Sequence, residues 1–251
     1  MPSYLEELFS LAGRTAMVTG GSSGIGFAMA EAMGRAGADL ILVARREKEL
    51  TEAVDRLEGI TVQTISADLA VRTEIERVTE QVPHVDILVN CAANNIRRPM
   101  DTLTEADWDA SLALNLTAPF LLGQHYGPRM AARGWGRIVN IGSQQTISAF
   151  GNSGGYGVSK AGVAALTRSQ AEAWSAYGVC VNTLIPGFVV TPLTAPAMAI
   201  PGRAEELAQR SMAKRNGLPS DFAGAAVFLT SGASAYVTGQ ILYVDGGFSV
   251  H

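Results

Sequence analysis

Short apolar runs rich in β-branched residues alternate with longer amphipathic stretches from Arg14 almost to the end of the chain. The runs have the length of single strands, and the stretches between them carry apolar residues at helical spacing. This alternation is typical of βαβ units, in which helices connect parallel strands. It predicts an α/β fold, a doubly wound parallel sheet of about seven strands with helices on both faces. The expected strands are residues 15–19, 39–43, 60–65, 86–89, 136–141, 179–184 and 241–244. The expected helices include residues 25–36, 47–57, 72–81, 156–177 and 220–229.

No linker, low-complexity tract or internal repeat divides the chain, so we expect a single domain over residues 1–251. One segment differs in texture, because residues 186–202 contain four prolines and little periodicity. A short helix-like stretch, residues 203–212, follows it. A long irregular segment after a strand of an open α/β sheet lies over the ligand crevice. The sequence therefore predicts a substrate lid at about residues 186–213.

The composition, 47% hydrophobic and 17% charged, excludes a disordered chain and favours a soluble globular protein. The formal net charge is −4, so the chain has no excess of basic residues to bind nucleic acid or anionic lipid, and we expect a small-molecule substrate. Cys91 and Cys180 stand in apolar runs, where buried free thiols are expected. The N-terminal residues lack the apolar core of a secretory signal, and no run approaches the ~20 apolar residues of a membrane span. We therefore expect a cytoplasmic location.

A glycine-rich loop, residues 19–26, follows the first expected strand and leads into the first expected helix. In this context Gly20 permits a tight turn, Gly24 lets the backbone approach a pyrophosphate, and Gly26 lets helix and strand pack closely. Free N–H groups at the start of a helix also favour an anion. The alternative is an ordinary glycine-rich turn. In the first interpretation the loop binds a dinucleotide cofactor through Gly20, Ser22, Ser23, Gly24, Ile25 and Gly26.

The end of the second expected strand distinguishes the two nicotinamide cofactors, because a carboxylate there binds the ribose hydroxyl of NAD whereas Arg accepts the 2′-phosphate of NADP. This chain has Arg45 and Arg46 there. Two cations at the start of a helix oppose its dipole unless an anion compensates them. A bound phosphate is one such anion, and Glu47 with Glu49 is the alternative. We expect NADP(H) to be favoured, with NAD(H) possible.

Two later strand ends carry further candidate cofactor contacts. Asp68 and Leu69 follow the third expected strand, where the carboxylate can hydrogen-bond a nucleotide base or simply stabilise a turn. Asn90 follows the fourth expected strand and offers an amide at the crevice. Its alternative role is structural, as an amide that ties neighbouring strands together. The two roles of Asn90 are compatible.

Tyr156 and Lys160 are four residues apart and therefore share one face of a helix. A cation beside a phenol stabilises the phenolate and lowers its pKa toward the working range. Ser143 lies just beyond the strand at residues 136–141, so its hydroxyl can face the same crevice and hydrogen-bond a substrate oxygen. Asn115 stands inside a helical stretch, where an amide is unusual. Each residue taken alone has a structural alternative, since Tyr–Lys pairs at this spacing are common on helix surfaces.

Together these motifs resemble those of the short-chain dehydrogenase/reductase family, from the glycine loop to residues 244–247. Residues 19–26 resemble its Thr-Gly-x-x-x-Gly-x-Gly loop and residues 90–93 its Asn-Asn-Ala-Gly segment. The resemblance implies a Rossmann-type fold and an NAD(P)-dependent oxidoreductase that transfers hydride between the cofactor and a secondary alcohol or ketone. Cys91 and Ala93 depart from the family pattern, and we expect them to affect backbone packing more than chemistry. The residues that resemble the family's catalytic tetrad are Asn115, Ser143, Tyr156 and Lys160.

The resemblance also implies a role for each member of the tetrad. Tyr156 donates or accepts the proton, Lys160 contacts the ribose and lowers the pKa of Tyr156, Ser143 orients the substrate, and Asn115 anchors a proton-relay water. The resemblance further implies a homotetramer, with helices 115–133 and 156–177 paired across a subunit face, although the apolar run after Tyr156 would pack equally well inside one subunit. The resemblance also implies a segment over the nicotinamide that contains Pro186, Gly187, Val189 and Thr191. In this segment Val189 would bond the carboxamide.

Within the family, residues 8–14, 95–99 and 191–196 resemble the sugar-acid branch, which includes gluconate 5-dehydrogenases and deoxygluconate dehydrogenases. Arg97 and Arg98 follow the crevice loop and offer a fork to a substrate carboxylate, or else form a solvated turn or a subunit contact. Gln144 and Gln145 supply amides suited to hydroxyl recognition. The expected substrate contacts are Arg97, Ser143, Gln145 and Tyr156.

Two other functions stay open at this point. Ketoacyl thioester reductases share the tetrad and the preference for NADP, and the basic docking patch that a carrier protein needs has candidates in Arg129, Arg133 and Arg137. A non-catalytic NADP-binding sensor is the more remote alternative, against which the complete tetrad argues. No metal is expected, because the scattered histidines offer no ligand cluster: His84, His125 and His251.

Overall fold

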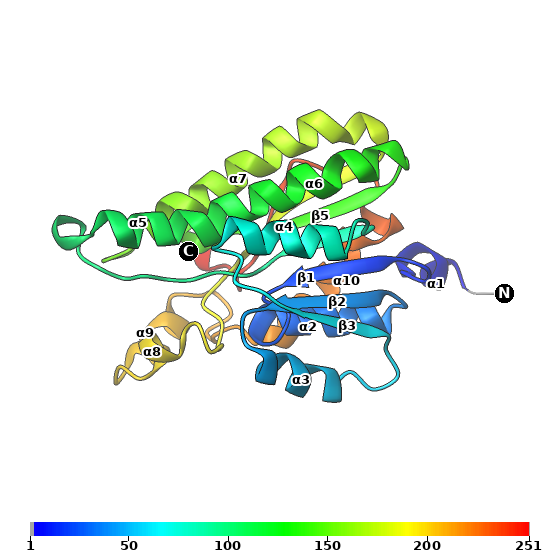
Figure 1. Cartoon of the computed structure of the whole chain (residues 1–251). Helices are drawn as coiled ribbons and strands as arrows, with labels where there is room; N and C mark the ends of the chain where they lie inside the picture. The colour runs from blue at the N-terminus through cyan, green and yellow to red at the C-terminus, as the bar shows by residue number, and fades with distance from the viewer. Residues whose placement is uncertain (1–2, 251) are drawn as a thin grey trace.

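The computed structural model describes residues 3–250, and within them seven parallel strands form one sheet in the order β3-β2-β1-β4-β5-β6-β7 (Figure 1). The parallel α/β sheet predicted from the alternating pattern is confirmed. The strand order reverses between β1 and β4, and a doubly wound sheet binds its ligand in the crevice at that point. His251 lies outside the described residues. The strands are β1 (Thr15–Thr19), β2 (Asp39–Ala44), β3 (Val62–Ser66), β4 (Ile87–Asn90), β5 (Gly136–Ile141), β6 (Val179–Pro186) and β7 (Ile241–Val244).

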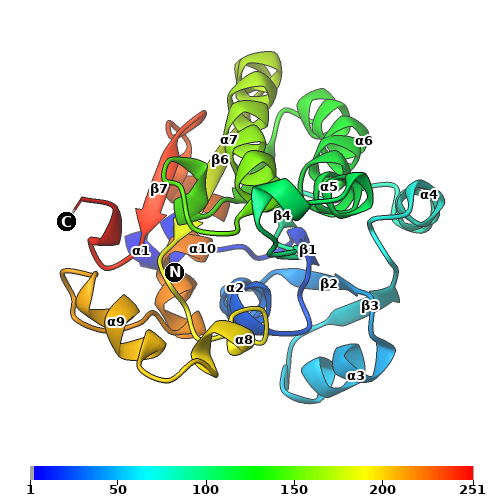
Figure 2. The ribbon, with the colours of Figure 1, turned by 90° about the vertical axis from the view of Figure 1, so that its left-hand side faces the viewer.

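Helices cover both faces of the sheet (Figures 1 and 2). The α-helices in residues 3–250 are α1 (Tyr4–Phe9), α2 (Gly24–Arg35), α3 (Glu47–Asp55), α4 (Arg72–Gln81), α5 (Glu105–Leu112), α6 (Ala118–Ala132), α7 (Gly154–Trp174), α8 (Ala195–Met198), α9 (Arg203–Gln209) and α10 (Ala223–Thr230). α2, α3 and α10 lie on one face, and α4, α6 and α7 lie on the other. The apolar sides of these helices form the two halves of the core with the sheet between them.

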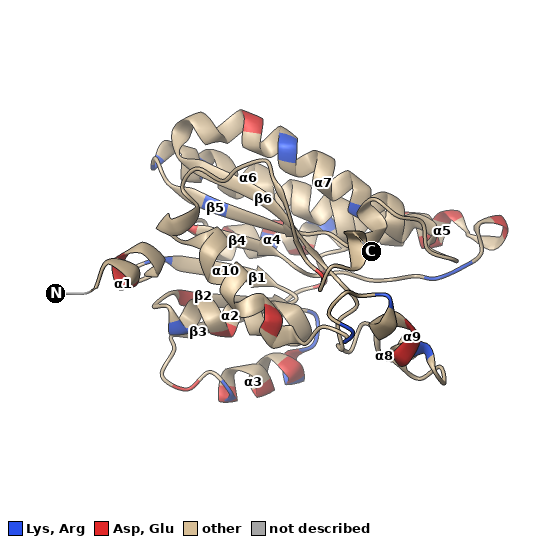
Figure 3. Ribbon diagram, turned by 180° about the vertical axis from the view of Figure 1, so that it is seen from behind, with Lys and Arg blue, Asp and Glu red and all other residues tan. Residues whose placement is uncertain are grey.

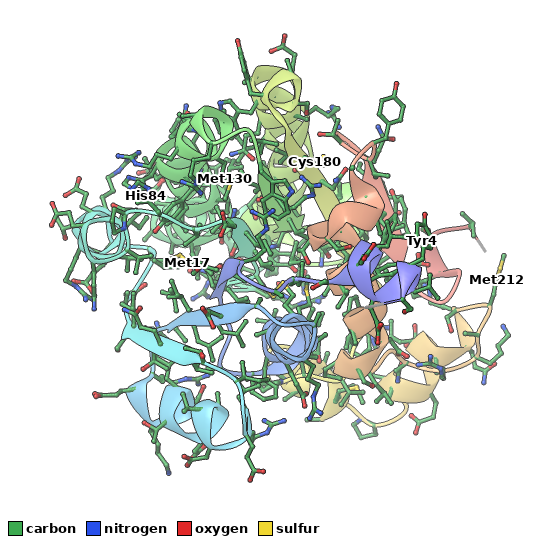
Figure 4. The ribbon with its side chains drawn as sticks, turned by 90° about the vertical axis from the view of Figure 1, so that its right-hand side faces the viewer. Tyr4, Met17, His84, Met130, Cys180 and Met212 are labelled. Carbon is green, nitrogen blue, oxygen red and sulfur yellow. The ribbon has the colours of Figure 1, made fainter. Side chains whose placement is uncertain are left out.

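The interior is apolar on both sides of the sheet. Met17 on β1 and Met130 on α6 are fully buried in the same cluster, and both are labelled in Figure 4. Cys180 is buried as expected, whereas Cys91 is only partly buried, and both thiols are free. Among the described helices none is long and apolar enough to cross a membrane.

Several elements differ from the sequence-based expectation at their ends. β3 begins two residues later than expected, because the chain turns at Gly59, which has a φ of +75°. The expected helix at 220–229 is a 3₁₀ turn, Pro219–Phe222, followed by α10. α1 and α8 are too short to show a helical period, so the sequence does not predict them. Ser3 and Glu6 nevertheless form a capping box at the start of α1.

Candidate active site

The glycine loop meets the helix start at the carboxyl end of β1. Gly20 and Gly24 have φ values of +67° and +57°, which side chains rarely adopt. A Cβ on Gly26 would lie 2.4 Å from the carbonyl oxygen of Gly20, so only glycine allows α2 to approach the loop this closely. The N-cap residue Ser23 makes no side-chain capping hydrogen bond. The loop thus presents an uncapped N-terminus of a 12-residue helix at the crevice.

The end of β2 carries Arg45 and Arg46, and each faces an acidic residue. Arg46 forms an ion pair with Glu49, as the alternative interpretation of this region predicts. Arg45 lies 3.8 Å from the carboxylate of Asp68 and is largely exposed. Asp68 also accepts a hydrogen bond from the N–H of Ala70 (3.0 Å), so it stabilises the turn after β3 as well. Arg45 and Asp68 therefore stand together at the same edge of the sheet.

Asn90 at the end of β4 is a structural amide. Its Nδ2 donates to Oδ1 of Asn140 (2.8 Å), which ties β4 to β5. Asn140 in turn donates to Thr167 and Gln170 on α7. The side chain of Asn90 is only 4% exposed. The strand-tying role left open by the sequence is therefore present.

The four residues expected to carry the chemistry come together on one side of the crevice. Tyr156, Lys160 and Asn115 are buried, and Ser143 is partly buried beyond β5. Lys160 Nζ donates to the carbonyl oxygen of Ile141 at the end of β5 (2.7 Å). Ser159, between Tyr156 and Lys160 in the chain, accepts a hydrogen bond from Asn115 Nδ2 (3.2 Å). These contacts connect β5, α7 and the segment that holds Asn115.

Asn115 lies in a π-helical turn, Ala113–Thr117, between α5 and α6. The helical stretch expected around Asn115 is present, but the sequence did not predict its π-helical turn. π-Helical turns inserted between α-helical segments are frequent at functional sites. Here the turn accompanies an exchange of hydrogen bonds with the loop after β4: the N–H of Asn94 donates to Asn115 Oδ1 (3.0 Å), and Asn115 Nδ2 donates to the carbonyl oxygen of Asn94 (3.0 Å).

Burial dominates the titration of the Tyr–Lys pair. It raises the pKa of Tyr156, and a hydrogen bond with Ser143 offsets only part of that rise. The net pKa shift of Tyr156 is upward and Lys160 is not among its causes, so the expected lowering of the Tyr156 pKa by Lys160 stays a prediction. Lys160 is buried too, which lowers its own pKa to about 8, and its ammonium faces the carbonyl of Ile141.

A cavity of about 520 Å³ opens beside Ser143 and Tyr156. It brings together every expected substrate contact, since Arg97 and Gln145 also line it. The end of β6 and the segment after it form another wall through Pro186, Gly187, Val189 and Thr191. Arg203 on α9 also lines the cavity and was not predicted as a site residue. Only the lid expected at residues 186–213 pointed to it.

The two arginines after β4 separate in the structure. Arg97 lines the cavity and donates to the carbonyl oxygen of Gly151 (2.6 Å). Arg98 pairs instead with Asp107 on α5 (2.8 Å) and is not among the residues that line the cavity. The expected two-arginine fork is therefore wrong, because α5 supplies a carboxylate that holds the second guanidinium away from the crevice.

The expected basic patch is not formed as such. Arg137 is only 3% exposed and donates to the carbonyl oxygens of Ser231 and Gly136. Arg133 donates to the carbonyl oxygen of Val85 (2.6 Å) and lies 3.5 Å from Asp86. Both guanidinium groups thus have partners within the protein, whereas Arg129, the third expected member of the patch, is exposed on α6.

Comparison with known proteins identifies the family. A family model described as "Enoyl-(Acyl carrier protein) reductase" matches residues 20–249. The chain is 36% identical to gluconate 5-dehydrogenase of Gluconobacter oxydans, over 97% of this chain and 98% of that protein. The chain belongs to the short-chain dehydrogenase/reductase family. Its relatives are dehydrogenases and reductases, and the chain is an oxidoreductase of this family.

Two solved structures of this short-chain dehydrogenase/reductase family have nearly the same fold. One is a gluconate 5-dehydrogenase from Burkholderia cenocepacia in complex with NADP and tartrate, with a TM-score of 0.91 and 34% identity, covering 99% of this chain and 100% of that chain. The other is a 3-oxoacyl (acyl-carrier-protein) reductase from Agrobacterium tumefaciens with NADP bound, with a TM-score of 0.90 and 37% identity over 97% of both chains. The fold is thus shared by relatives with different substrates.

In the segment after β4, this chain differs from the family's usual pattern at Cys91. A Cβ on Gly26 would lie 3.3 Å from the sulfur of Cys91, so the thiol packs against the glycine loop. Burial raises the pKa of Cys91 to about 11, and the thiol stays protonated near neutral pH. Thr19, which we did not predict as a site residue, accepts hydrogen bonds from the N–H groups of Cys91 (3.0 Å) and Ala92 (3.1 Å). It joins the ends of β1 and β4.

The segment between β6 and α10 carries α8 and α9 at one end of the sheet (Figure 2). Thr194 anchors its beginning by donating to the carbonyl oxygen of Val189 (2.6 Å). Arg210 anchors its end, because the guanidinium lies over two aromatic rings, 4.5 Å from the centroid of Phe248 and 5.4 Å from that of Phe150. Both rings line the cavity.

Proposed function

We propose that the protein is an NADP(H)-dependent oxidoreductase that interconverts a secondary alcohol and a ketone of a sugar or sugar acid. The observation that carries this proposal is the cavity beside Tyr156 and Ser143, whose wall includes the guanidinium of Arg97 and the amide of Gln145. An apolar substrate would leave the amide oxygen of Gln145 without a partner, and it would offer no anion to Arg97, which otherwise donates to the carbonyl oxygen of Gly151. A hydroxylated carboxylic acid would pair with both side chains.

The residues of the nucleotide-binding side fit an NADP molecule. The uncapped N-terminus of α2 offers N–H groups to the pyrophosphate, and the Cβ-free position at Gly26 keeps that backbone within reach. Arg45 is exposed at the end of β2, where a 2′-phosphate would lie, and Asp68 is available for the base. NADPH, when bound, supplies the hydride that reduces the carbonyl carbon. The remaining steps belong to this chain's own side chains.

In the proposed mechanism Tyr156 delivers the proton to the substrate oxygen during reduction and removes it during oxidation. Ser143 orients that oxygen through a hydrogen bond. Lys160 lies one helical turn from Tyr156, and its charge favours the phenolate. Asn115 acts at a distance by fixing the loop after β4 against α7. The segment at 186–213 closes over the substrate and excludes water.

Ketoacyl thioester reduction is the second candidate function, and the relative from Agrobacterium tumefaciens is named for that activity. Two observations favour the sugar-acid proposal over it. The cavity wall is polar at Arg97 and Gln145, and Arg133 and Arg137 are engaged within the protein rather than free to dock a carrier. A non-catalytic sensor is disfavoured because burying Lys160 beside Tyr156 is costly, and such perturbed groups gather at catalytic sites.

We also propose a homotetramer in the cytoplasm. In Figure 3 the ribbons of α6 and α7 carry few charged residues: Arg129 on α6, and Lys160, Arg168 and Glu172 on α7. Phe120 on α6 and Val158 on α7 are exposed apolar side chains, at 41% and 46%. Apolar surface of this kind favours burial against a second copy. Light scattering that gives the mass of one chain would contradict the assembly.

The test of the proposed function compares the wild-type protein with Tyr156→Phe. The substitution removes only the hydroxyl, so NADPH affinity should stay within about threefold while turnover of a keto sugar acid falls by roughly 10³ or more. NADPH affinity is measured by fluorescence titration and turnover by absorbance at saturating cofactor. Retained turnover would contradict the role of Tyr156.

A further inference from the structure

Two side-chain amides on the cavity wall have buried oxygens without hydrogen-bond partners in residues 3–250. They are Oδ1 of Asn95 and Oε1 of Gln145, and both residues line the cavity beside Tyr156. A buried acceptor left without a donor costs about 1–3 kcal/mol, so native proteins seldom keep one without a purpose. Gln145 belongs to the substrate contacts already proposed, whereas Asn95 has no role so far.

The backbone before Asn95 is held firmly at the edge of the cavity. Asn94 exchanges backbone and side-chain hydrogen bonds with Asn115, and its own amide Nδ2 donates to the carbonyl oxygen of Ala110 on α5 (2.9 Å). Asn94 is therefore occupied by α5 and the π-helical turn. Asn95, the next residue, lines the cavity instead. A fixed backbone reduces the entropy lost when this side chain binds a ligand.

Three polar residues thus line one open cavity from two loops. The loop after β4 contributes Asn95 and Arg97, and the loop after β5 contributes Gln145. The backbone N–H of Gln145 donates to the hydroxyl of Ser143 (3.2 Å), which places Gln145 next to the group that would orient the reacting oxygen. An amide can pair with a hydroxyl as acceptor or as donor. Substrate hydroxyls near the reacting carbon would satisfy both amides.

We infer that Asn95 is a specificity-determining residue, whose amide binds a hydroxyl of a polyhydroxylated keto acid and rejects the deoxy analogue. This inference rests on the proposed function, because it deepens the description of the substrate at the same site. A substrate with only a carbonyl and a carboxylate would leave the Asn95 amide unpaired. Sites built to pair with a hydroxyl discriminate strongly against analogues that lack it.

The experiment uses two ketones that differ only in hydroxyl groups. 5-Ketogluconate and 5-oxohexanoate share the carboxylate, the chain length and the position of the carbonyl. We would measure kcat/KM for both with NADPH, using the wild-type protein and Asn95→Leu, which keeps the size of the side chain but removes its polar atoms. Leu193→Ala is the matched control, because Leu193 lines the same cavity with an apolar side chain.

The inference predicts that Asn95→Leu lowers the preference for 5-ketogluconate over 5-oxohexanoate by at least ~10-fold, whereas Leu193→Ala changes both substrates in parallel. An equal loss on both substrates in Asn95→Leu, or no loss on either, would overturn it. Asn95→Ala gives the same comparison if the leucine variant does not fold.

Failure of the proposed function has a different signature. If the wild-type protein reduces neither ketone, the proposed function is wrong, and calorimetry in the presence of NADP then decides the inference. The inference predicts that the wild-type protein binds D-gluconate more tightly than hexanoate and that Asn95→Leu reduces this difference at least ~10-fold. Equal affinities in the wild-type protein, or an unchanged difference in Asn95→Leu, would overturn it.

Discussion

The nucleotide side and the substrate side of this molecule are built in different ways. The nucleotide side, β1 to β4 with α2, α3 and the glycine loop, is positioned by backbone contacts, such as the approach of Gly26 to the carbonyl of Gly20. The substrate side comprises residues 91–98, 143–152 and 186–213. There, side chains from distant segments hold one another, as Arg210 does with Phe150 and Phe248.

The difference shows how a shared scaffold accommodates different substrates. Backbone contacts at the nucleotide side tolerate few side chains, and two relatives with NADP bound share the fold. Side-chain contacts at the substrate side are replaced more easily, because each depends on one residue in each of two loops. Four substitutions test this contrast; the first three, which change binding or cofactor choice, are ordered from the largest expected effect to the smallest, and the fourth concerns stability.

Gly26→Ala should disrupt the nucleotide side most. The added Cβ would meet the carbonyl oxygen of Gly20, a backbone atom that cannot move without displacing the loop. We expect NADPH affinity to fall by ~100-fold or more, or about 2.7 kcal/mol. Gly224→Ala on α10 is the control, because no atom lies within 4 Å of its added Cβ. Equal NADPH affinities for the two variants, measured by fluorescence titration, would contradict a backbone-defined site.

Arg45→Asp should change cofactor choice without changing substrate choice. Loss of a charge-assisted bond to the 2′-phosphate is worth about 1.5–3 kcal/mol, so the NADP/NAD ratio of kcat/KM should fall roughly 10- to 100-fold. Lys48→Asp is the control, since Lys48 stands on α3, three residues after Arg45, and lies 3.8 Å from Glu52. An unchanged ratio in Arg45→Asp, from initial rates with each cofactor, would leave the assignment of Arg45 without support.

Arg97→Met should weaken acidic substrates selectively. Arg97 lines the cavity, so its loss should raise KM for a keto sugar acid about 10-fold and leave a neutral keto sugar nearly unaffected. Arg98→Met is the matched control, because Arg98 is paired with Asp107. Steady-state kinetics on both substrates decide the matter. The same rise in KM for Arg97→Met and Arg98→Met would show that both arginines attract acidic substrates only through their overall charge.

Lys160, where the two sides meet, should make stability depend on pH. Burial lowers its pKa from 10.5 to about 8, so between these values the unfolded chain binds a proton that the folded chain has released. The free energy of unfolding therefore rises with pH across this window. Relative to Lys160→Met, the wild-type protein should gain on the order of 1–3 kcal/mol between pH 8 and 10. Urea unfolding at each pH measures the free energy of unfolding of both proteins. If this free energy changes with pH equally in the wild-type protein and in Lys160→Met, the prediction is wrong.

The contrast between the two sides also explains what the sequence could predict. The strands and the glycine loop follow from local patterns, and the alternation of strands with helices predicts a parallel sheet. The sequence could not predict that Arg98 pairs with Asp107, because that contact depends on where α5 packs. The π-helical turn at Asn115 and the raised pKa of Tyr156 likewise depend on tertiary burial. Spacing alone does not report burial.

The most direct test of the central claim is NADPH consumption by the purified wild-type protein near neutral pH on a paired panel. One half of the panel is 5-ketogluconate and related keto acids, and the other half is acetoacetyl thioesters, each repeated with NADH. The account predicts turnover confined to the keto sugar acids and faster with NADPH than with NADH. Turnover of the thioesters in preference to the keto sugar acids would contradict it.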